Sequence, residues 1–429
     1  MHNSAVSDLR VTRRAEIPDR FRVERCLRLP EFGPRLLFFS GGSALRKTSR
    51  TLKRYTHNST HVITAFDSGG SSAELRRIFR MPSIGDLRNR LLALADESVQ
   101  GNPEIYRLFS HRLPFDEAPR ELESRFRALV DGTDPLVSEL PPAMARLVRT
   151  HLRAFAERAS DTRFDLRGAS IGNLVLAAGY LENDRHLDSV LFLFSKLVGV
   201  LGNVVPVTEE DAHLAATLSD HSQVVGQHMF RRLTQRIETV SLVSTDAAAS
   251  PGLVATAGGA PGSAPEAARS TDLDSAGTSS DGRTVWASDV AANPKAIDAI
   301  GEADLICYPM GSFFSSIVAN VLPSGIREAI AASQAPKVYV PNTGLDPEQG
   351  GRSAAECLHV LLELTGSADR GPGVDFVLLD KSDAAYATDP ERKKIEATGV
   401  RLIELDLASS DAAAPIGPER LVEALVSLA

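Results

Sequence analysis

The chain has 429 residues, enough for one large domain or for two to three domains of ordinary size. Hydrophobic residues make up 43% and charged residues 24%, and the net charge of −8 excludes a general basic field for nucleic acid or for an anionic membrane. Three distant cysteines indicate neither a disulfide framework nor a zinc site, and no segment reaches the roughly 18 apolar residues of a membrane span. Because the N-terminus also lacks the apolar stretch of a signal peptide, we expect a cytoplasmic protein.

The chain begins with an arginine-rich stretch, residues 1–34, that shows no regular pattern and that we expect to be an irregular extension on the main domain. An α/β domain is predicted over 35–429. Its first strands are Leu36–Phe39 and Val62–Phe66, each followed by a helical pattern of apolar residues. Ser71 and Glu74 have the spacing of a capping box, which predicts the start of a helix.

The middle of the chain departs from this alternation. Residues of about 98–165 have a helical pattern and are predicted to form a helical insert. Strands are predicted at 203–207 and 223–230. Residues of about 245–283 are small, polar and rich in Pro and Gly, so they cannot bury enough apolar surface to offset the entropy of ordering them, and a flexible loop is predicted there.

Strands and helices alternate again in the last third of the chain. Strands are predicted at 303–308, 337–340, 374–379 and 400–405, with helices between them. Such alternation predicts right-handed crossovers and a mostly parallel sheet covered by helices on both faces. Ligands of these sheets bind beyond the carboxyl ends of the strands, where the loops 40–44, 67–72 and 309–316 are expected.

The first of these loops joins a predicted strand to a predicted helix through SGGSALRKT. Its spelling departs from a P-loop because Arg46 takes the place of the second glycine. Gly41, Gly42 and Ser43 would still offer backbone N–H groups to an anion at a helix start. The alternative is a tight turn without a ligand.

The second loop reads FDSGGSS and combines a carboxylate with two glycines and three serines. Asp67 would end a strand, Gly69 and Gly70 would allow close backbone approach, and Ser71 would lie near phosphate. Asp86 supplies a second carboxylate at a later helix start. Two carboxylates in one crevice can share Mg²⁺, which usually takes one or two of them plus ligand phosphates. The alternative is that Asp86 only caps its helix.

The third loop, YPMGSFFSS, again follows a strand and opens a helix. Gly311, Ser312, Ser315 and Ser316 would place hydroxyls and free amides near a diphosphate. Three glycine- and serine-containing loops at strand ends favour a nucleotide or a nucleotide-linked small molecule as the partner over three plain turns.

In this order the loops resemble the CofD/YvcK-like family. The matching segments span roughly residues 36–345, apart from the insert and the predicted loop, and they read FFSGGSALRKTSRTLKRY, ITAFDSGGSSAELR, PSIGDLRNRLLALAD, IGNLVLAA, VVPVTEEDAHLAATL, NPKAIDAIGEADLICYPMGSFFSSIVANVLPSGIREAI and KVYVPNTG. The resemblance implies a Rossmann-like three-layer α/β/α fold and a homodimer.

Two functions are implied by the resemblance. CofD itself is a Mg²⁺-dependent transferase that moves a phospholactyl-type group from a guanosine diphosphate adduct to a deazaflavin. YvcK-type members bind UDP-sugars and regulate carbon metabolism and cell-wall synthesis. We expect a transferase of the first kind and keep the second function as the alternative.

The resemblance also assigns residues. Asp67 and Asp86 match acidic positions of the family and are the expected catalytic and metal-binding residues, although Ser68 replaces a second aspartate that many members have. The positions expected to bind the nucleotide or its phosphates are Gly41, Gly42, Ser43, Gly69, Gly70, Ser71, Asn173, Gly311, Ser312, Ser315, Ser316 and Asn342.

Overall fold

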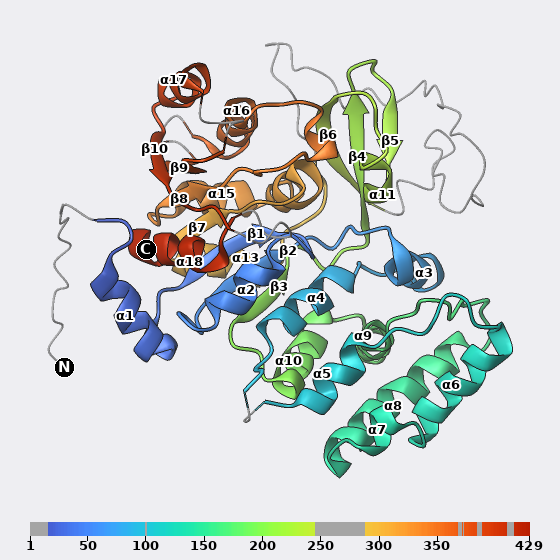
Figure 1. Cartoon of the computed structure of the whole chain (residues 1–429). Coiled ribbons are helices and arrows are strands. Elements are labelled where there is room, and N and C mark those ends of the chain that lie inside the picture. The colour runs from blue at the N-terminus through green and yellow to red at the C-terminus, as the bar shows by residue number, and fades with distance from the viewer. Residues whose placement is uncertain are drawn as a thin grey trace, which may run out of the picture.

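A seven-stranded sheet, in which every pair of neighbouring strands is parallel, forms the centre of the protein (Figure 1). The computed structural model describes residues 16–98, 101–244, 288–367, 371, 373–383, 388–409 and 416–429. The loop predicted at 245–283 lies outside these residues. In spatial order the strands are β10 (Arg401–Leu405), β9 (Phe376–Asp380), β8 (Lys337–Tyr339), β7 (Leu305–Tyr308), β1 (Leu36–Ser40), β2 (Thr60–Ile63) and β3 (Asn203–Pro206).

Successive side chains of a strand point to opposite faces of the sheet, and apolar clusters cover both faces here. In β1, Leu37 and Phe39 enter one apolar cluster, whereas Leu36 and Phe38 enter another on the opposite face. The first cluster is covered by α13 (Pro294–Glu302), η2 (Phe313–Val318), α14 (Ala319–Val321), α15 (Ile326–Ala332), α16 (Ala354–Thr365) and α17 (Asp389–Ala397). The second is covered by α1 (Arg20–Arg28), α2 (Arg46–Leu52) and α18 (Pro418–Leu428). The three-layer α/β/α prediction is confirmed.

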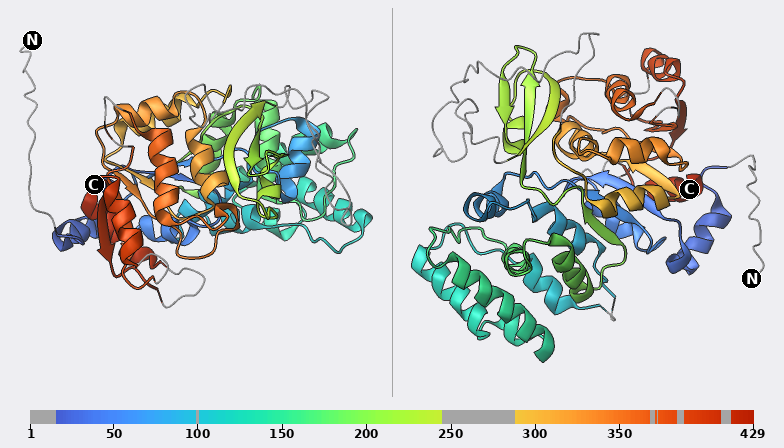
Figure 2. Two further views of the ribbon diagram at one scale, coloured as in Figure 1. Left: turned by 90° about the horizontal axis from the view of Figure 1, so that it is seen from above. Right: turned by 180° about the vertical axis from the view of Figure 1, so that it is seen from behind.

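A third apolar cluster joins the helices of the segment expected as an insert to the helices that precede and follow it. These are α3 (Gly70–Phe79), α4 (Gly85–Leu94), α5 (Pro103–Ser110), α6 (Pro119–Asp131), α7 (Pro135–Ser138), α8 (Pro142–Ala159), α9 (Ile171–Glu182) and α10 (Leu187–Val198). Helices α6 and α8 lie at the periphery of the molecule (Figure 2). No helix in the described part of the chain combines the length and the apolar character that a bilayer crossing requires.

The strand order places a topological switch point between β1 and β7. From β1 the chain proceeds outward through β2 and β3, and from β7 it proceeds in the other direction through β8, β9 and β10. Crossovers from β1 and β7 therefore leave on opposite faces of the sheet, and a crevice opens beyond the carboxyl ends of these two strands. The loops at 41–45 and 309–312 both lie at this crevice.

A separate antiparallel sheet, β5 (Gln223–Val225), β4 (Ala212–Leu218) and β6 (Ile237–Ser244), stands between α3 and α16 (Figure 1). On one side, the buried guanidinium of Arg76 bonds the Asp211 carboxylate at 2.8 Å and the Phe66 carbonyl at 3.1 Å. On the other side, Arg236 pairs with Glu356 at 2.7 Å. These contacts tie the small sheet to both halves of the α/β domain.

The strand expected at 223–230 is half correct. It ends at Val225 because Gly226 has a φ of +104°, and the chain continues as the short helix α11 (Gln227–Phe230). The predicted extension at 1–34 is not irregular in its described part, since α1 and the turn η1 (Pro30–Phe32) occupy it.

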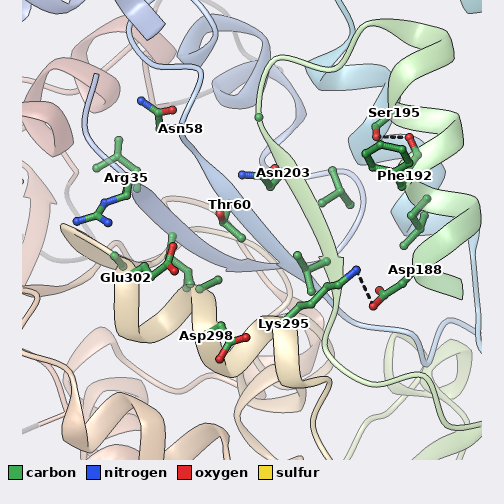
Figure 3. A pocket seen from close by; sticks show the side chains of 18 of the residues that line it. Arg35, Asn58, Thr60, Asp188, Phe192, Ser195, Asn203, Lys295, Asp298 and Glu302 are labelled. Atoms are coloured by element: carbon green, nitrogen blue, oxygen red, sulfur yellow. Dashed lines mark hydrogen bonds and ion pairs between the residues drawn. The ribbon is translucent and has the colours of Figure 1, made fainter. Parts of the chain in front are cut away.

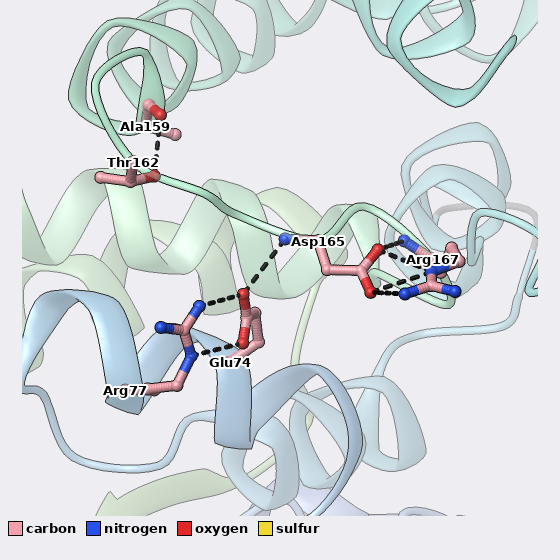
Figure 4. A network of polar contacts seen from close by, with 6 residues as sticks. All are labelled: Glu74, Arg77, Ala159, Thr162, Asp165 and Arg167. Atoms are coloured by element: carbon pink, nitrogen blue, oxygen red, sulfur yellow. Dashed lines mark hydrogen bonds and ion pairs between the residues drawn. The ribbon is translucent and has the colours of Figure 1, made fainter. Parts of the chain in front are cut away.

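The capping box expected from Ser71 and Glu74 does not form, because α3 starts at Gly70 with Gly69 as its cap and no side-chain cap bond. Glu74 instead receives two hydrogen bonds from Arg77 and one, at 3.1 Å, from the backbone of Asp165 (Figure 4). Glu74 therefore links α3 to the segment that follows α8.

Candidate functional site

A cavity of about 270 Å³ lies at the carboxyl ends of β1 and β7. Of the residues selected from the sequence, those that line it are Gly41, Gly42, Ser43, Asp67, Asp86, Gly311, Ser312 and Ser316. A second cavity, of about 700 Å³, shares Ser43, Gly311 and Ser312 with the first and extends past Asn342 toward Leu345. Together the two cavities form a continuous depression across the switch point.

Asp67 and Asp86 face the same cavity from different elements. Asp67 follows β2 and accepts a hydrogen bond from the Gly69 N–H at 3.0 Å, whereas Asp86 lies in the first turn of α4. The surrounding protein desolvates both carboxylates. This desolvation, with the neighbouring Asp67 charge as the second cause, raises the pKa of Asp86 to about 7, and burial also raises the pKa of Asp67. The charge of Asp67 therefore acts on Asp86.

The glycines of the first loop are needed for close approach. A Cβ on Gly42 would lie 2.0 Å from Asp86 Oδ1, and the Gly42 N–H is hydrogen-bonded to the Asp86 carboxylate. A Cβ on Gly41 would lie 2.5 Å from Ser316 Oγ. The buried guanidinium of Arg90 donates to the Gly41 carbonyl at 2.8 Å from behind. Asp86 therefore bonds across to the glycine loop and is not the N-cap of α4, a position that Ile84 occupies.

The two carboxylates have the chemistry of a partial hard-cation site. Within the described residues, neither Asp67 nor Asp86 has an ion-pair partner, and no group of three or more His, Cys, Asp or Glu side chains could hold a metal. Desolvation raises both pKa values, and repulsion by Asp67 adds to the rise at Asp86; a divalent cation would offset both effects. The donor set fits Mg²⁺ only with further oxygens from water or a ligand, which is the usual arrangement for that ion.

The helix start at 312–316 differs from the expectation of free amides. The Phe313 N–H donates to Asp346 Oδ2 at 2.8 Å, and the Ser315 N–H donates to Glu348 Oε2 at 2.9 Å. The Ser315 hydroxyl also donates to Glu348, at 2.6 Å, and Ser315 has no exposed surface. The amides that were expected to bind a phosphate thus donate to carboxylates of the protein itself. In this conformation Ser315 cannot reach a ligand. Ser312 and Ser316 do line the cavity.

Asn342 fixes the position of Gly311. Its side-chain oxygen accepts from the Gly311 N–H at 2.8 Å, and its side-chain N–H group donates to the Gly311 carbonyl at 2.6 Å. The other expected residues lie outside the linings of both cavities. Asn173 is buried and donates to Ser71 Oγ at 2.9 Å, and neither of them, nor Gly69 or Gly70, lines either cavity.

Several polar residues that line these cavities were not selected from the sequence, among them Gln227, Arg231 and Asp346. Gln227 and Arg231 come from the small sheet and line the smaller cavity, and Arg231 also lines the larger one. Asp346 and Glu348 belong to the loop after β8, at the start of η3 (Pro347–Gln349). The pair Arg231-Arg232 matches no binding motif, so the sequence does not single out Arg231, whereas Asp346 and Glu348 follow a strand end and a search of strand-end acids would have found them.

A further cavity, of about 490 Å³, lies at the opposite end of the molecule beside the edge strand β3 (Figure 3). Two of its basic side chains pair with protein carboxylates, since Lys295 bonds Asp188 at 2.9 Å and Arg35 bonds Asp304 at 2.9 Å. It lies beside the amino ends of the strands, away from the switch point, and it shares no residue with the first two cavities.

Comparisons with known proteins agree on one family. The family model described as 2-phospho-L-lactate transferase CofD matches residues 36–261 and 272–413. A putative gluconeogenesis factor of Nostoc sp. is 28% identical over 330 residues, which cover 77% of this chain and 52% of that protein, so the chain spans about half of its length. The gluconeogenesis factor of Bacillus subtilis is 26% identical over 375 residues, which cover 87% of this chain and 86% of that protein.

Solved structures support the same fold. A crystal structure of a UPF0052 family member from Bacillus halodurans has a TM-score of 0.62 and 23% identity, and it covers 91% of this chain and 99% of that chain. The family match includes every residue that lines the smaller cavity. The chain therefore belongs to the 2-phospho-L-lactate transferase CofD family, with curated relatives of the gluconeogenesis-factor type.

Proposed function

We propose that the protein binds a nucleotide-diphosphate-linked ligand at the switch point, together with Mg²⁺ held by Asp67 and Asp86. The observation that carries this proposal is a pair of half-buried carboxylates without ion-pair partners that face one cavity beside a glycine loop. A ligand that brings phosphate oxygens would complete the coordination of the cation. The larger adjoining cavity has room for the remainder of a nucleotide-sized ligand.

The reaction that we propose is transfer of a phosphate-linked group with release of a nucleoside monophosphate. An acceptor hydroxyl would form a new bond to phosphorus and lose its proton to solvent water, the phosphoanhydride bond of the donor would break, and the leaving phosphate would keep the electron pair. Bound Mg²⁺ would stabilise the negative charge that develops on the phosphate oxygens. The side chains of Ser43 and Ser312, which line both cavities, would orient the donor.

A second candidate function is ligand sensing without turnover. Two observations favour it, namely the curated relatives named gluconeogenesis factor and the engagement of Ser68 with His228 at 2.8 Å where an acidic side chain would add a metal ligand. A sensor would use the same cavity and the same cation. The two candidates differ only in whether bound donor is consumed.

Thermal shift measurements test binding first. GDP, UDP and a UDP-sugar, each with and without Mg²⁺, should raise the melting temperature in a Mg²⁺-dependent manner, because a ligand that binds only the folded state stabilises it. Asp67→Asn should remove the Mg²⁺-dependent part. No shift with any nucleotide would refute the proposed function.

Release of a nucleoside monophosphate from a bound nucleotide-linked donor, measured by chromatography, then separates the transferase from the sensor. The expected homodimer stays a prediction, which light scattering of the purified protein would check.

A further inference from the structure

The short helix α11 extends from the small antiparallel sheet into the switch-point cavity. Gln227 and Arg231 are four positions apart, and Arg231 keeps helical backbone angles, so the two side chains share one face. Both line the cavity that contains Asp67 and Asp86. The side-chain oxygen of Gln227 is buried and has no hydrogen-bond partner within the described residues. The small sheet thus supplies polar groups that local packing does not use.

Arg231 is the cationic side chain common to the linings of the two cavities at the switch point. Burial raises the pKa values of Asp67, Asp86, Asp346 and Glu348, and the positive charge of Arg231 offsets a part of each rise, so Arg231 is close enough to act on all four carboxylates. Within the described residues, however, its guanidinium makes neither a hydrogen bond nor an ion pair with any of them. A guanidinium in this position is available to an anion that enters from solvent.

Packing and hydrogen bonds hold α11 in place. Phe230 is fully buried in the main apolar cluster, and the Gly226 N–H donates to the Leu214 carbonyl at 2.8 Å. Ser68 accepts a hydrogen bond from the His228 backbone N–H at 3.2 Å, and its Oγ lies 2.8 Å from His228 Nδ1. Ser68 and His228 therefore clamp α11 to the loop that carries Asp67.

The usual anion-binding groups of the β7 loop are already engaged. The amides of Phe313 and Ser315 bond to Asp346 and Glu348, and the Gly311 amide bonds to Asn342. A phosphate that enters between β1 and β7 therefore needs another source of positive charge. Arg46 and Lys47 line only the larger cavity, whereas Arg231 lines both cavities.

We propose that Arg231 binds the phosphate groups of the ligand from above the switch point, with Gln227 beside it, and that Ser68 and His228 are positioning residues for this arginine. This inference rests on the proposed function, since it assigns the residue that recognises the diphosphate of the nucleotide-linked ligand. The small sheet is then a recognition element, and the α/β domain supplies the carboxylates and the glycine loop.

Arg232 offers a matched control, because it is the adjacent arginine, is also exposed, and lines neither cavity. Arg231→Ala and Arg232→Ala change the net charge equally. We expect Arg231→Ala to weaken GDP or UDP binding, measured by calorimetry with Mg²⁺, by roughly ten- to a hundredfold, as for loss of a hydrogen bond to a charged group. Arg232→Ala should change it less than about twofold.

The free nucleosides guanosine and uridine test whether the loss concerns phosphate. Any affinity of the wild type for them should be the same in Arg231→Ala. Arg231→Lys should recover part of the diphosphate affinity, because lysine keeps the charge but lacks the planar fork of donors. The slope of affinity against salt concentration should fall in Arg231→Ala and stay unchanged in Arg232→Ala.

The positioning role of Ser68 is tested by combining Ser68→Ala with Arg231→Ala. Ser68→Ala should weaken diphosphate binding in the wild type but cost little more in the Arg231→Ala background, because both changes remove the same contact. Ser68→Thr keeps the hydroxyl and should restore binding. Circular dichroism and melting temperature must show each variant folded.

These outcomes separate the role of Arg231 from the proposed function itself. If the wild type binds a nucleoside diphosphate and Arg231→Ala behaves like Arg232→Ala, the role of Arg231 is refuted while the proposed function remains. If additive losses follow from Ser68→Ala and Arg231→Ala, the positioning role is refuted. If the wild type binds none of the nucleotides, the proposed function fails and the role of Arg231 fails with it.

Discussion

Replacing Glu348 by glutamine should make the protein less sensitive to alkaline pH. The Glu348 side chain is buried and accepts hydrogen bonds from the N–H and the hydroxyl of Ser315 at 2.9 and 2.6 Å. Burial raises its pKa from the ordinary value of 4.5 to about 7. In Glu348→Gln, the amide oxygen can accept from the Ser315 N–H and the amide N–H can donate to the hydroxyl, so both bonds are kept without a buried charge.

Proton linkage determines whether the free energy of unfolding rises or falls with pH. The folded protein holds the Glu348 proton more tightly than the unfolded chain, so the stabilisation due to this proton is complete below about pH 4.5 and is lost as the pH rises through about 7. Between pH 5 and pH 8 the loss amounts to about 2–3 kcal/mol. The variant lacks the titrating group, so its free energy of unfolding should gain this amount relative to wild type over that range.

Urea unfolding followed by circular dichroism at pH 5, 6, 7 and 8 measures this difference. The exposed Glu363, on α16, is a matched control, and Glu363→Gln should run parallel to wild type at every pH. If the difference between Glu348→Gln and wild type varies by less than about 1 kcal/mol across the range, the buried charge is not the cause of the pH sensitivity and the reasoning is wrong.

Three more results are expected. Gly42→Ala should cost about 1–3 kcal/mol of stability and disrupt Mg²⁺-dependent binding, because its Cβ would displace the Asp86 carboxylate. The control Gly301→Ala meets open space away from both cavities and should be neutral, and melting temperature and ligand titration check both variants. Asp67→Asn should remove most of the Mg²⁺-dependent binding. If Asp67 and Asp86 share one cation, adding Asp86→Asn should reduce the binding affinity little further. Additive losses of affinity without Mg²⁺ dependence would contradict the shared site. Replacing 245–283 by a short Gly/Ser linker should leave the melting temperature within a few degrees, because the segment has almost no large apolar residues and because Ser288 pairs with Leu242, which brings described residues on its two sides together; a larger fall would show that the segment contributes to the fold.

Much of the fold could be predicted from the sequence because most of its strands belong to one parallel sheet, which leaves a simple sequence pattern. Strands buried on both faces are continuous apolar runs, such as Leu36–Phe39, and in a parallel sheet their carboxyl ends share one edge. That rule is sufficient to bring Gly42, Asp67, Asp86 and Ser316 to one cavity although they are far apart in the chain.

The features that escaped prediction depend on contacts between distant elements. Gln227 and Arg231 reach the cavity only because Gly226 ends a strand and a second sheet docks on the first, which no local periodicity encodes. Asp346 and Glu348 bind the amides at 313 and 315, so a helix start that looks free in the sequence is satisfied by a later loop. Propensity indicates where such a helix begins but not which group bonds to its first N–H groups.

The ion pair beside β3 has a consequence for the solubility of the protein. Within the described residues, β3 is an outer strand of the main sheet, and an outer strand presents unpaired peptide groups that invite another chain to add on. Lys295 of α13 and Asp188 of α10 approach from the two faces of the sheet and bond beside this strand, with Asp298 and Glu302 nearby (Figure 3). An incoming strand would have to separate the pair and cover carboxylates. Uncharged substitutions at these positions should therefore promote aggregation of a protein whose cavity and fold are otherwise intact.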